Sequence, residues 1–374
     1  MKNKFSIVAC LAAAAIAIPA GPAMAGSTPE HSEPRTLAEN LMGPLSLAVD
    51  SEESVLVTQN FASLLSRVND DGTATTVYTG KEGWDVAGVE SRRGTTYFVE
   101  SVGAGAGDPN ALEGYLKSID QQGEVRTIAN LAAYERDHNP DRDQHYGFGP
   151  EVSAECLAGW PAFPPARYQG AVDSHPYGVA VRGGTAYIAD AGVNAILEVD
   201  IETGDVSTLA VLPPRPAVIP AGTRIPVDMA GNTVEVPACV VGHEYAFEPV
   251  PTDVEFGPDG RLYVTSLPGG PEDRSLGARG AIFRVNPWSG SSHVWAKDIL
   301  SPTGLAFTDD GDAYVASMFG NEIIRVDAWT RDKSQFLAID GPAAVEVRGS
   351  TLYATAGFNF ADPSKGKVIK AGIR

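Results

Sequence analysis

One stretch decides the fold: Pro176-Tyr-Gly-Val-Ala-Val-Arg-Gly-Gly-Thr-Ala-Tyr-Ile-Ala-Asp-Ala-Gly-Val-Asn-Ala-Ile-Leu-Glu-Val-Asp200. It holds three short segments rich in β-branched, aromatic and small residues, separated by turn sequences that contain Gly and Asn. Segments of this kind are typical of β-strands joined by tight turns. A fourth such segment follows at Val206-Ser-Thr-Leu209. The stretch therefore predicts one antiparallel unit of four strands.

The same unit recurs along the chain. The first strands of six units begin at Pro44, Asp85, Pro176, Pro251, Pro302 and Pro342. A large apolar residue of the second strand follows 11 or 12 residues later, at Leu56, Tyr97, Tyr187, Tyr263, Tyr314 and Tyr353. Repeats of roughly 40 residues with four strands each are typical of propeller blades. A β-sandwich, the rival all-β architecture, gives no reason for six repeats in one register.

The last unit lacks a fourth strand. It ends at Lys367-Val-Ile-Lys370, which matches a third strand, whereas Arg35-Thr-Leu-Ala-Glu-Asn-Leu41 precedes the first unit and resembles a fourth strand. We predict that these two segments pair and close a ring. The sequence thus predicts an all-β, six-bladed β-propeller over residues 35–374, with four-stranded blades.

Four long connections interrupt the repeats, and antiparallel strand order places all of them on one face, here called the loop face. Residues 103–114 and 267–280 join second to third strands, and residues 132–174 and 213–250 join successive blades. Irregular chain gathered on one face of a rigid scaffold favours a binding surface over neutral drift in loop length. The opposite side, here called the turn face, keeps short turns.

The first residues, 1–25, have the pattern of a cleavable signal peptide. Two lysines precede an apolar run from Ile7 to Ile18, and Ala23-Met-Ala25 is a small-residue cleavage site. We expect a secreted, monomeric mature chain with an N-terminal extension at residues 26–34.

Removing the two lysines of the signal peptide from the 28 basic residues leaves 26 against 47 acidic ones, a net charge of −21. This charge disfavours nucleic acid and membrane insertion as partners.

Two cysteines remain after the signal peptide, one in each of the two longest connections. They are Cys156 and Cys239. Because an exported chain meets an oxidising environment, we predict that they form a disulfide rather than two free thiols.

Sequence motifs give little catalytic chemistry. The sequence contains no Gly-x-Ser-x-Gly elbow, no His-Glu-x-x-His and no P-loop. One segment places oxygen ligands at alternate positions, as a calcium loop does: Asp137, Asn139, Asp141 and Asp143. It lacks the glycine of the sharp turn and the closing bidentate Glu, so a solvated loop is the favoured interpretation and Ca²⁺ the alternative.

The centre of the ring supplies the candidate ligand site. First strands are innermost, so their starts and the ends of the second strands should surround the mouth of a central channel on the loop face. These positions carry Trp84, Asp85, Glu100, His175, Tyr177, Asp190 and Asp253. Clustered carboxylates favour a cation or a ligand rich in hydroxyl groups. Asp190 and Asp253 are also candidate metal ligands, and a water-filled channel with hydrated carboxylates is the alternative.

Several segments resemble the ScyD/ScyE family of propeller proteins. They are Asp173-Ser-His-Pro-Tyr-Gly-Val-Ala180, the NHL-type repeat from Tyr187 to Asp200, Val250-Pro-Thr-Asp-Val-Glu-Phe-Gly-Pro-Asp-Gly-Arg-Leu-Tyr-Val264, and Ala133-Tyr-Glu135 with Asn139-Pro-Asp141. The family is named after proteins linked to the pathway of the pigment scytonemin. The resemblance covers nearly the whole mature chain and implies an exported propeller, but no particular reaction.

The chain departs from that family pattern at His175, where the family has Asn, and at Ser266 and Ser317, where it has Glu. We expect a binding or scaffold protein that takes a small molecule, a glycan or a protein on its loop face. The alternative is a metal-dependent hydrolase or lactonase similar to gluconolactonase and strictosidine-synthase propellers, which hold a divalent ion with inner-strand Glu, Asn and Asp. The first blade begins Pro44-Leu-Ser46, with no such Glu.

Overall fold

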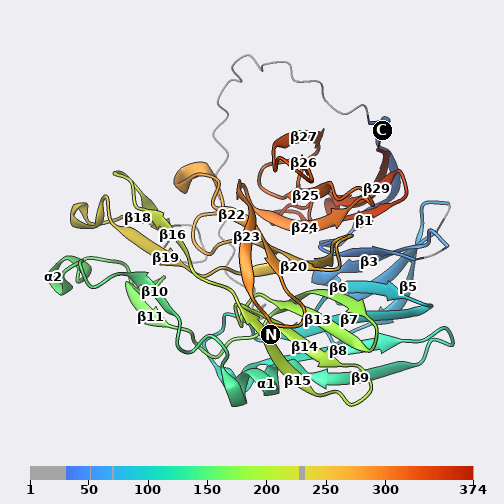
Figure 1. Ribbon diagram of the computed structural model, residues 1–374, viewed down its shortest axis with the longest axis horizontal. Coiled ribbons are helices and arrows are strands. Elements are labelled where there is room, and N and C mark those ends of the chain that lie inside the picture. Colours follow the sequence, from blue (N-terminus) through green and yellow to red (C-terminus); the bar gives the residue numbers. More distant parts are fainter. Residues whose placement is uncertain (1–30, 51, 70, 227–231, 374) are drawn as a thin grey trace.

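The six repeats form six four-stranded antiparallel sheets arranged as the blades of a propeller (Figure 1). The computed structural model describes residues 31–50, 52–69, 71–226 and 232–373, so the predicted signal peptide lies outside the described residues. Within each of the first three blades the strands follow one another in sequence order. These blades are β2 Leu47–Val49, β3 Val55–Gln59, β4 Leu64–Val68 and β5 Ala74–Thr79; β6 Asp85–Arg92, β7 Thr95–Val102, β8 Glu113–Ile119 and β9 Val125–Asn130; and β12 Pro176–Arg182, β13 Thr185–Asp190, β14 Ala195–Asp200 and β15 Val206–Val211.

The last blade is completed by the N-terminal strand, as predicted. Blades four to six are β20 Pro251–Phe256, β21 Leu262–Ser266, β22 Gly280–Val285 and β23 Ser292–Ile299; β24 Pro302–Phe307, β25 Ala313–Ser317, β26 Glu322–Val326 and β27 Lys333–Ala338; and β28 Val345–Arg348, β29 Thr351–Ala356, β30 Gly366–Gly372 and β1 Arg35–Leu41.

Ring closure rests on the pairing of β1 with β30. The ladder runs from Arg35 opposite Lys370 to Leu41 opposite Gly366. Leu41 is buried in a hydrophobic cluster that also contains residues of blade one and of β30. The two ends of the chain are therefore held in one sheet, and the ring has no open edge between its first and last blades.

The turn between the first and second strands differs in length among the blades. This difference explains why the distance from the first residue of a repeat to the large apolar residue of its second strand is sometimes 11 and sometimes 12 residues. Five residues separate the first two strands in blades one, four and five, and two residues in blades two, three and six. Val86 pairs with Glu100 as Pro176 pairs with Asp190. The alignment of the second repeat on Asp85 was therefore wrong by one residue, because its two-residue turn shortens the spacing to 11. Asp85 corresponds to His175.

The two longest insertions form a seventh four-stranded sheet that the sequence did not predict. Its order is β11-β10-β19-β16, and β10 pairs with β19 to join the two insertions. Figure 1 shows this insertion sheet projecting from the left of the ring. The elements of the insertions are α1 Leu131–His138, β10 His145–Phe148, α2 Ala154–Leu157, β11 Arg167–Gln169, β16 Arg215–Val218, β17 Arg224–Pro226, β18 Thr233–Glu235 and β19 Glu244–Phe247.

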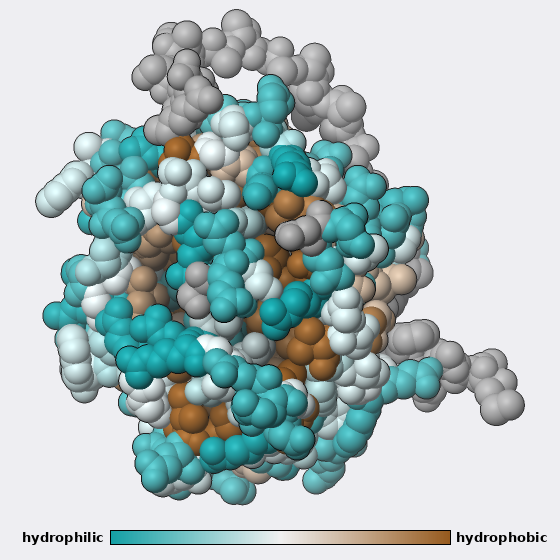
Figure 2. Space-filling view, turned by 90° about the vertical axis from the view of Figure 1, so that its right-hand side faces the viewer, coloured by the Kyte–Doolittle hydropathy of each residue, from teal (hydrophilic) through white to brown (hydrophobic). Residues whose placement is uncertain are grey.

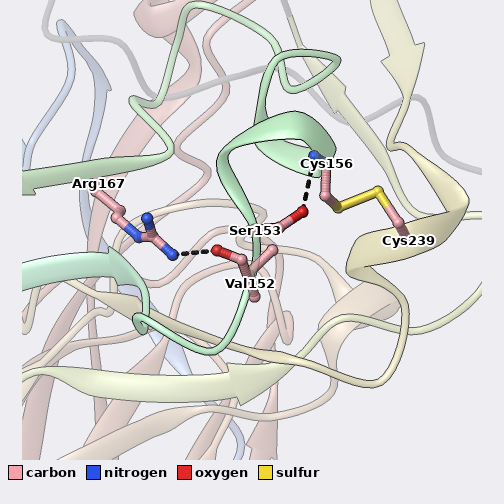
Figure 3. Close-up of a disulfide and its surroundings, with 5 residues drawn as sticks. All are labelled: Val152, Ser153, Cys156, Arg167 and Cys239. Carbon is pink, nitrogen blue, oxygen red and sulfur yellow. Dashed lines mark hydrogen bonds between the residues drawn. A yellow bond between two sulfur atoms is a disulfide. The ribbon is translucent and has the colours of Figure 1, made fainter.

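The insertion sheet has its own apolar core and its own covalent link. Phe148, Trp160 and Tyr245 are buried and pack ring against ring, at 4.8 to 5.5 Å between centroids. The predicted disulfide joins Cys156 in α2 to Cys239 in the second insertion (Figure 3). Beside it, the Ser153 hydroxyl accepts a hydrogen bond from the Cys156 N–H, and the Arg167 guanidinium donates to the Val152 carbonyl. The two insertions are thus one folded platform.

The opposite side of the molecule is a surface of short turns. Figure 2 views the molecule from the side away from the insertion sheet and shows hydrophilic ridges with hydrophobic residues recessed between them. Among the described residues, no helix is both long enough and apolar enough to cross a membrane. The insertion sheet lies on the side of the ring away from this surface (Figure 1).

Removing β1 should destabilise the whole ring. A chain that begins at Met42 loses the buried Leu41 side chain, whose burial contributes about 2 kcal/mol, and leaves β30 as an exposed edge. We expect its melting temperature to fall by several degrees relative to a chain that begins at Arg35, which keeps the strand. Differential scanning calorimetry of the two truncations tests this, and equal melting temperatures would contradict closure by β1.

Loss of the disulfide should loosen the insertion sheet alone. The bond closes a loop across 83 residues, which corresponds to about 4 kcal/mol of unfolded-state entropy in the chain model. In Cys156→Ser/Cys239→Ser we expect faster amide exchange in β10 and β19, with the protection of blade strands such as β13 unchanged. Hydrogen exchange with mass spectrometry measures both. Loss of protection throughout the ring would show that the blades depend on the bond.

Candidate functional site

The inner strands leave a narrow channel along the axis of the propeller. Its cavity measures about 20 Å³, and one water molecule needs roughly 10–15 Å³ on this scale. The channel therefore has room for water or an ion, but not for an organic ligand of the size of a sugar. All six blades contribute to its lining: Leu45, Ser46, Leu47, Val89, Tyr177, Val179, Thr252, Asp253, Glu255, Thr303, Ala344, Val345 and Glu346.

Three of the predicted site residues meet at the loop-face mouth of this channel. His175 Nε2 lies 3.4 Å from Asp85 Oδ2, and the imidazole meets the ring of Tyr177 edge to face, with 5.6 Å between centroids. Asp85 and His175 are equivalent residues of neighbouring blades, which is why the repeat brings them together. Their side chains are 32% and 12% exposed, and His175 Nε2 itself is buried, so solvent reaches the Asp85 carboxylate rather than this imidazole nitrogen.

The charges around His175 favour its protonated form. Burial alone lowers the pKa of His175, but the interaction with Asp85 and the charges of Asp190 and Asp173 raise it above its ordinary value. The mouth therefore presents a carboxylate beside an imidazole that holds its proton to a higher pH than a solvated histidine does.

Asp190 holds the backbone of the mouth residues in place, and its carboxylate does not face the channel mouth. The side chain is fully buried, and its carboxylate accepts hydrogen bonds from the N–H groups of His175, Gly192 and Val193 and from the Ser174 hydroxyl. Burial nevertheless raises the pKa of Asp190 to about 6. These bonds fix the backbone on which His175 stands, so Asp190 is a positioning residue.

Trp84 and Glu100 are also engaged elsewhere. The ring of Trp84 stacks on Tyr115 at 6.0 Å between centroids, and Lys81 Nζ lies 4.3 Å from the Trp84 centroid. Glu100 is 1% exposed, pairs with Lys117 and accepts a hydrogen bond of 2.7 Å from the Tyr78 hydroxyl. Second-strand ends such as Glu100 lie one strand farther from the axis than first strands, which is why they face the blade interior.

Asp253 lies inside the channel and ties two blades together. Its carboxylate accepts hydrogen bonds from the N–H of Val254, at 2.9 Å, and from the N–H of Leu305 in the next blade, at 2.7 Å. Strand pairing places it where blades three and five have Gly178 and Gly304. Burial raises the pKa of Asp253 to about 7 even though both hydrogen bonds lower it.

Three glutamates that the sequence analysis missed occupy one repeat position toward the turn face. They are Glu90, Glu255 and Glu346, each paired in its ladder with the tyrosine of the second strand. Blades one, three and five have alanine at this position: Ala48, Ala180 and Ala306. Glutamate and alanine thus alternate around the ring. This alternation is present in the sequence repeats, but the one-residue error in the alignment of blade two hid it.

These channel carboxyls are only partly exposed, and their pKa values lie above the ordinary range. Burial raises the pKa of Glu90 to about 7 and that of Glu346 to about 8, and it raises the pKa of Glu255 well above its ordinary value. The charges of the neighbouring acids act in the same direction, and Arg348 opposes them. The Arg348 guanidinium also donates to the Val49 carbonyl of blade one, at 2.9 Å. Arg92 also opposes the acids at Glu90, so the channel is an acidic network with two arginines acting on it.

The predicted calcium-loop residues do not converge on one site. Asp137 and Asp143 are exposed, Asn139 ends α1 in a left-handed conformation with φ of 38°, and Asp141 is buried. In the part of the chain that the structure describes, no group of three or more His, Cys, Asp or Glu side chains is placed to hold a metal ion. Asp190 and Asp253 accordingly belong to no such group.

Comparison with known proteins supports the architecture only. No protein-family model and no functionally curated protein matches the sequence. The fold is similar to virginiamycin B lyase from Staphylococcus aureus (TM-score 0.51, 16% identity, 92% of this chain and 100% of the lyase). It is also similar to a gluconolactonase from Xanthomonas campestris (0.54, 12%, 96% and 99%) and to PQQ-bound aldose sugar dehydrogenase from Streptomyces coelicolor (0.54, 13%, 92% and 100%). At such identities, the likeness shows a six-bladed propeller and no reaction.

Stability should fall as the pH rises from 5 to 8. The folded channel keeps protons on Glu90, Asp253 and Glu346 up to about pH 7 to 8, whereas the unfolded chain releases them near pH 4. The folded state thus binds more protons in this window, and its stability is lost as the pH rises through the folded pKa values. We expect Glu255→Gln/Glu346→Gln to raise the melting temperature at pH 8 and to flatten this dependence.

The matched control is Glu124→Gln/Glu202→Gln, which removes two exposed carboxylates and should leave the pH profile unchanged. Thermal melts from pH 5 to 8 compare the three proteins. A profile that the channel double variant does not flatten would mean that Glu255 and Glu346 are ionised in the folded ring.

Proposed function

We propose that this chain is an exported binding protein of the ScyD/ScyE type that recognises its ligand on the loop face, at the channel mouth formed by Asp85, His175 and Tyr177. One observation carries the proposal: the channel is too small for an organic ligand, whereas its mouth holds a partly exposed Asp85 carboxylate beside His175 on rigid inner strands. Recognition at a rigid surface loses little conformational entropy on binding.

The surroundings of the channel mouth favour a ligand that contacts a wide area and matches the shape of that surface. Asp173 of the first insertion accepts hydrogen bonds from the N–H of Gly105 in the loop of blade two, so neighbouring loops brace each other there. The insertion sheet projects from the ring on the same face (Figure 1). A small molecule, a glycan or a protein segment can each contact such a surface. The chemistry of the side chains at the mouth therefore decides which class of ligand is favoured.

The chemistry favours hydroxyl-rich or cationic ligands. Asp85 offers acceptor oxygens and Tyr177 an aromatic ring, which together suit the hydroxyl groups and apolar face of a sugar, and His175 supplies positive charge beside Asp85. The net negative charge of the chain repels anions.

A second candidate function is hydrolysis of an ester or lactone. The observation that favours it is the contact between His175 and Asp85, because a carboxylate that orients an imidazole is the usual arrangement of a general base. The described residues offer no three-ligand metal group, so this hypothesis is carried by His175 and not by a metal. Hydrolysis of a lactone panel with a pH dependence that His175→Gln abolishes would favour it over binding alone.

The mouth residues should control affinity without controlling the fold. For a ligand found by screening glycans and small molecules, we expect Asp85→Asn/His175→Gln to weaken binding at least tenfold, about 1.4 kcal/mol, because it removes the charged acceptor and donor. Isothermal titration calorimetry measures the affinity, and a thermal melt checks that the ring is intact.

The control for this experiment is Asp309→Asn, which removes an exposed carboxylate from a turn on the opposite face and should leave the affinity unchanged. A ligand whose affinity responds to Asp309→Asn and ignores the mouth variant would place the binding site on the turn face and end the proposal.

A further inference from the structure

A set of buried oxygen atoms without hydrogen-bond partners lies at the base of the first insertion. Glu135 is 0% exposed, and neither of its carboxyl oxygens has a hydrogen bond of good geometry, although the main-chain N–H of Asp173 acts on the carboxyl and lowers its pKa. Asp141, 1% exposed, has an unpartnered Oδ1, and the buried Oδ1 of Asn139 is unpartnered too. Four buried acceptor oxygens on three side chains of one short segment are costly unless a cation or a donor satisfies them.

The local backbone places these three residues on the end of one helix and the turn that follows it. Glu135 lies in the last turn of α1, and its carbonyl accepts a 2.8 Å hydrogen bond from the N–H of Asn139, which leaves the helix in a left-handed conformation. The Asn139 side-chain amide donates to the carbonyl of Gly170, at 3.1 Å. Its Nδ2 is therefore engaged, and its Oδ1 remains available as an acceptor.

The second carboxylate is positioned by the blades as well as by the insertion. Asp141 Oδ2 accepts hydrogen bonds from the Tyr146 hydroxyl of β10, at 2.9 Å, and from the Asn194 amide in blade three, at 3.0 Å. Its Oδ1 faces Gly170 so closely that a Cβ added at that glycine would come within 2.1 Å of it. A glycine is needed there, and the Asp141 carboxylate is held in one orientation.

The carboxyl groups around this segment have little basic compensation. His175 lowers the pKa of Asp173 and Asp190, whereas the charges that act on Glu135 are those of other acids. Asp173 and Asp190 lie near enough to raise the pKa of Glu135 together with Asp141, although burial is the largest cause, and the value reaches about 9. Within the described residues, no Lys or Arg forms an ion pair with Glu135, Asp141, Asp173 or Asp190. The Arg348 of the channel has no counterpart here.

We propose that Glu135, Asn139 and Asp141 bind a divalent cation of the calcium class. Carboxylate and amide oxygens are the ligands that such hard cations prefer, and the two carboxylates match a double positive charge. Water or main-chain carbonyls complete the coordination. The site differs from the calcium loop expected from alternate residues, because the exposed Asp137 and Asp143 are replaced by the buried Glu135.

Such a cation would brace the base of the insertion sheet. Through Asp141 the site reaches β10 and Asn194, and the Asn194 side chain in turn accepts a hydrogen bond from the N–H of Val250, where the second insertion rejoins the ring. One ion would therefore connect α1, both insertions and blade three. This inference does not depend on the proposed ligand site at the channel mouth.

The test is cation binding by the full mature chain. Protein stripped with EDTA is titrated with Ca²⁺ from 0.01 to 10 mM, a range that covers extracellular calcium sites. We expect the melting temperature to rise with Ca²⁺, and we expect Tb³⁺ to show luminescence on tyrosine excitation, because the Tyr146 hydroxyl bonds to Asp141. Ca²⁺ should displace that signal.

Variants separate a cation site from a merely structural role. Glu135→Gln should lose both the Ca²⁺-dependent shift and the terbium signal, while its melting temperature in EDTA stays equal to the wild type or rises, because an isolated buried carboxyl has been removed. Asp137→Asn/Asp143→Asn, which changes only exposed acids, should keep both responses. Wild-type protein with no response up to 10 mM Ca²⁺, or Glu135→Gln with an unchanged response, would overturn the proposal.

Discussion

The structure depends on how closely the six first strands approach one another around the axis. At Gly88, an added Cβ would lie 2.7 Å from the Tyr177 carbonyl oxygen of the next blade, and at Gly304 it would lie 2.7 Å from Ala344 Cα. Neighbouring blades are joined at the same level by side-chain hydrogen bonds, such as those from Thr252 to the Pro302 carbonyl and from Thr303 to the Ala343 carbonyl. This close approach leaves an axial cavity of water size, so recognition of anything larger must take place at a face.

The same constraint explains why the fold was predictable and parts of the site were not. The blades followed from short-range patterns, because each blade strand pairs with its neighbour in sequence. Ring closure followed from the fourth strand that the last repeat lacks, and the disulfide from the two cysteines that remain after the signal peptide. The insertion sheet required β10 to pair with β19, about one hundred residues away, and no local pattern in either strand indicates its partner. For the site, equivalent repeat positions brought Asp85 to His175, whereas Glu100 turned into a blade because second strands lie outside the first.

Acidic groups are enclosed at two places in the ring, and their compensation differs. In the channel, Arg348 opposes the charges of Glu255 and Glu346, and Asp253 accepts two backbone hydrogen bonds. At the base of the first insertion, Glu135 lacks both a basic partner and a hydrogen bond of good geometry. A protonated glutamic acid would still need an acceptor for its hydroxyl group, so neutralisation by a proton leaves the polar atoms unsatisfied. The first arrangement is self-sufficient, and the proposed cation would complete the second.

The loop face is held rigid by the inner strands beneath it, by the disulfide and aromatic core of the insertion sheet, and by a contact with blade three. The inner strands fix the starts of β6 and β12, and the four hydrogen bonds to Asp190 fix the backbone on which His175 stands. The disulfide and the aromatic core hold the insertion sheet together, and Asn194 links its base to blade three. A surface fixed from several sides can discriminate between ligands by shape, because it cannot rearrange to accept a poor one. This rigidity, more than any single side chain, is what suits a propeller with a narrow channel to a binding role.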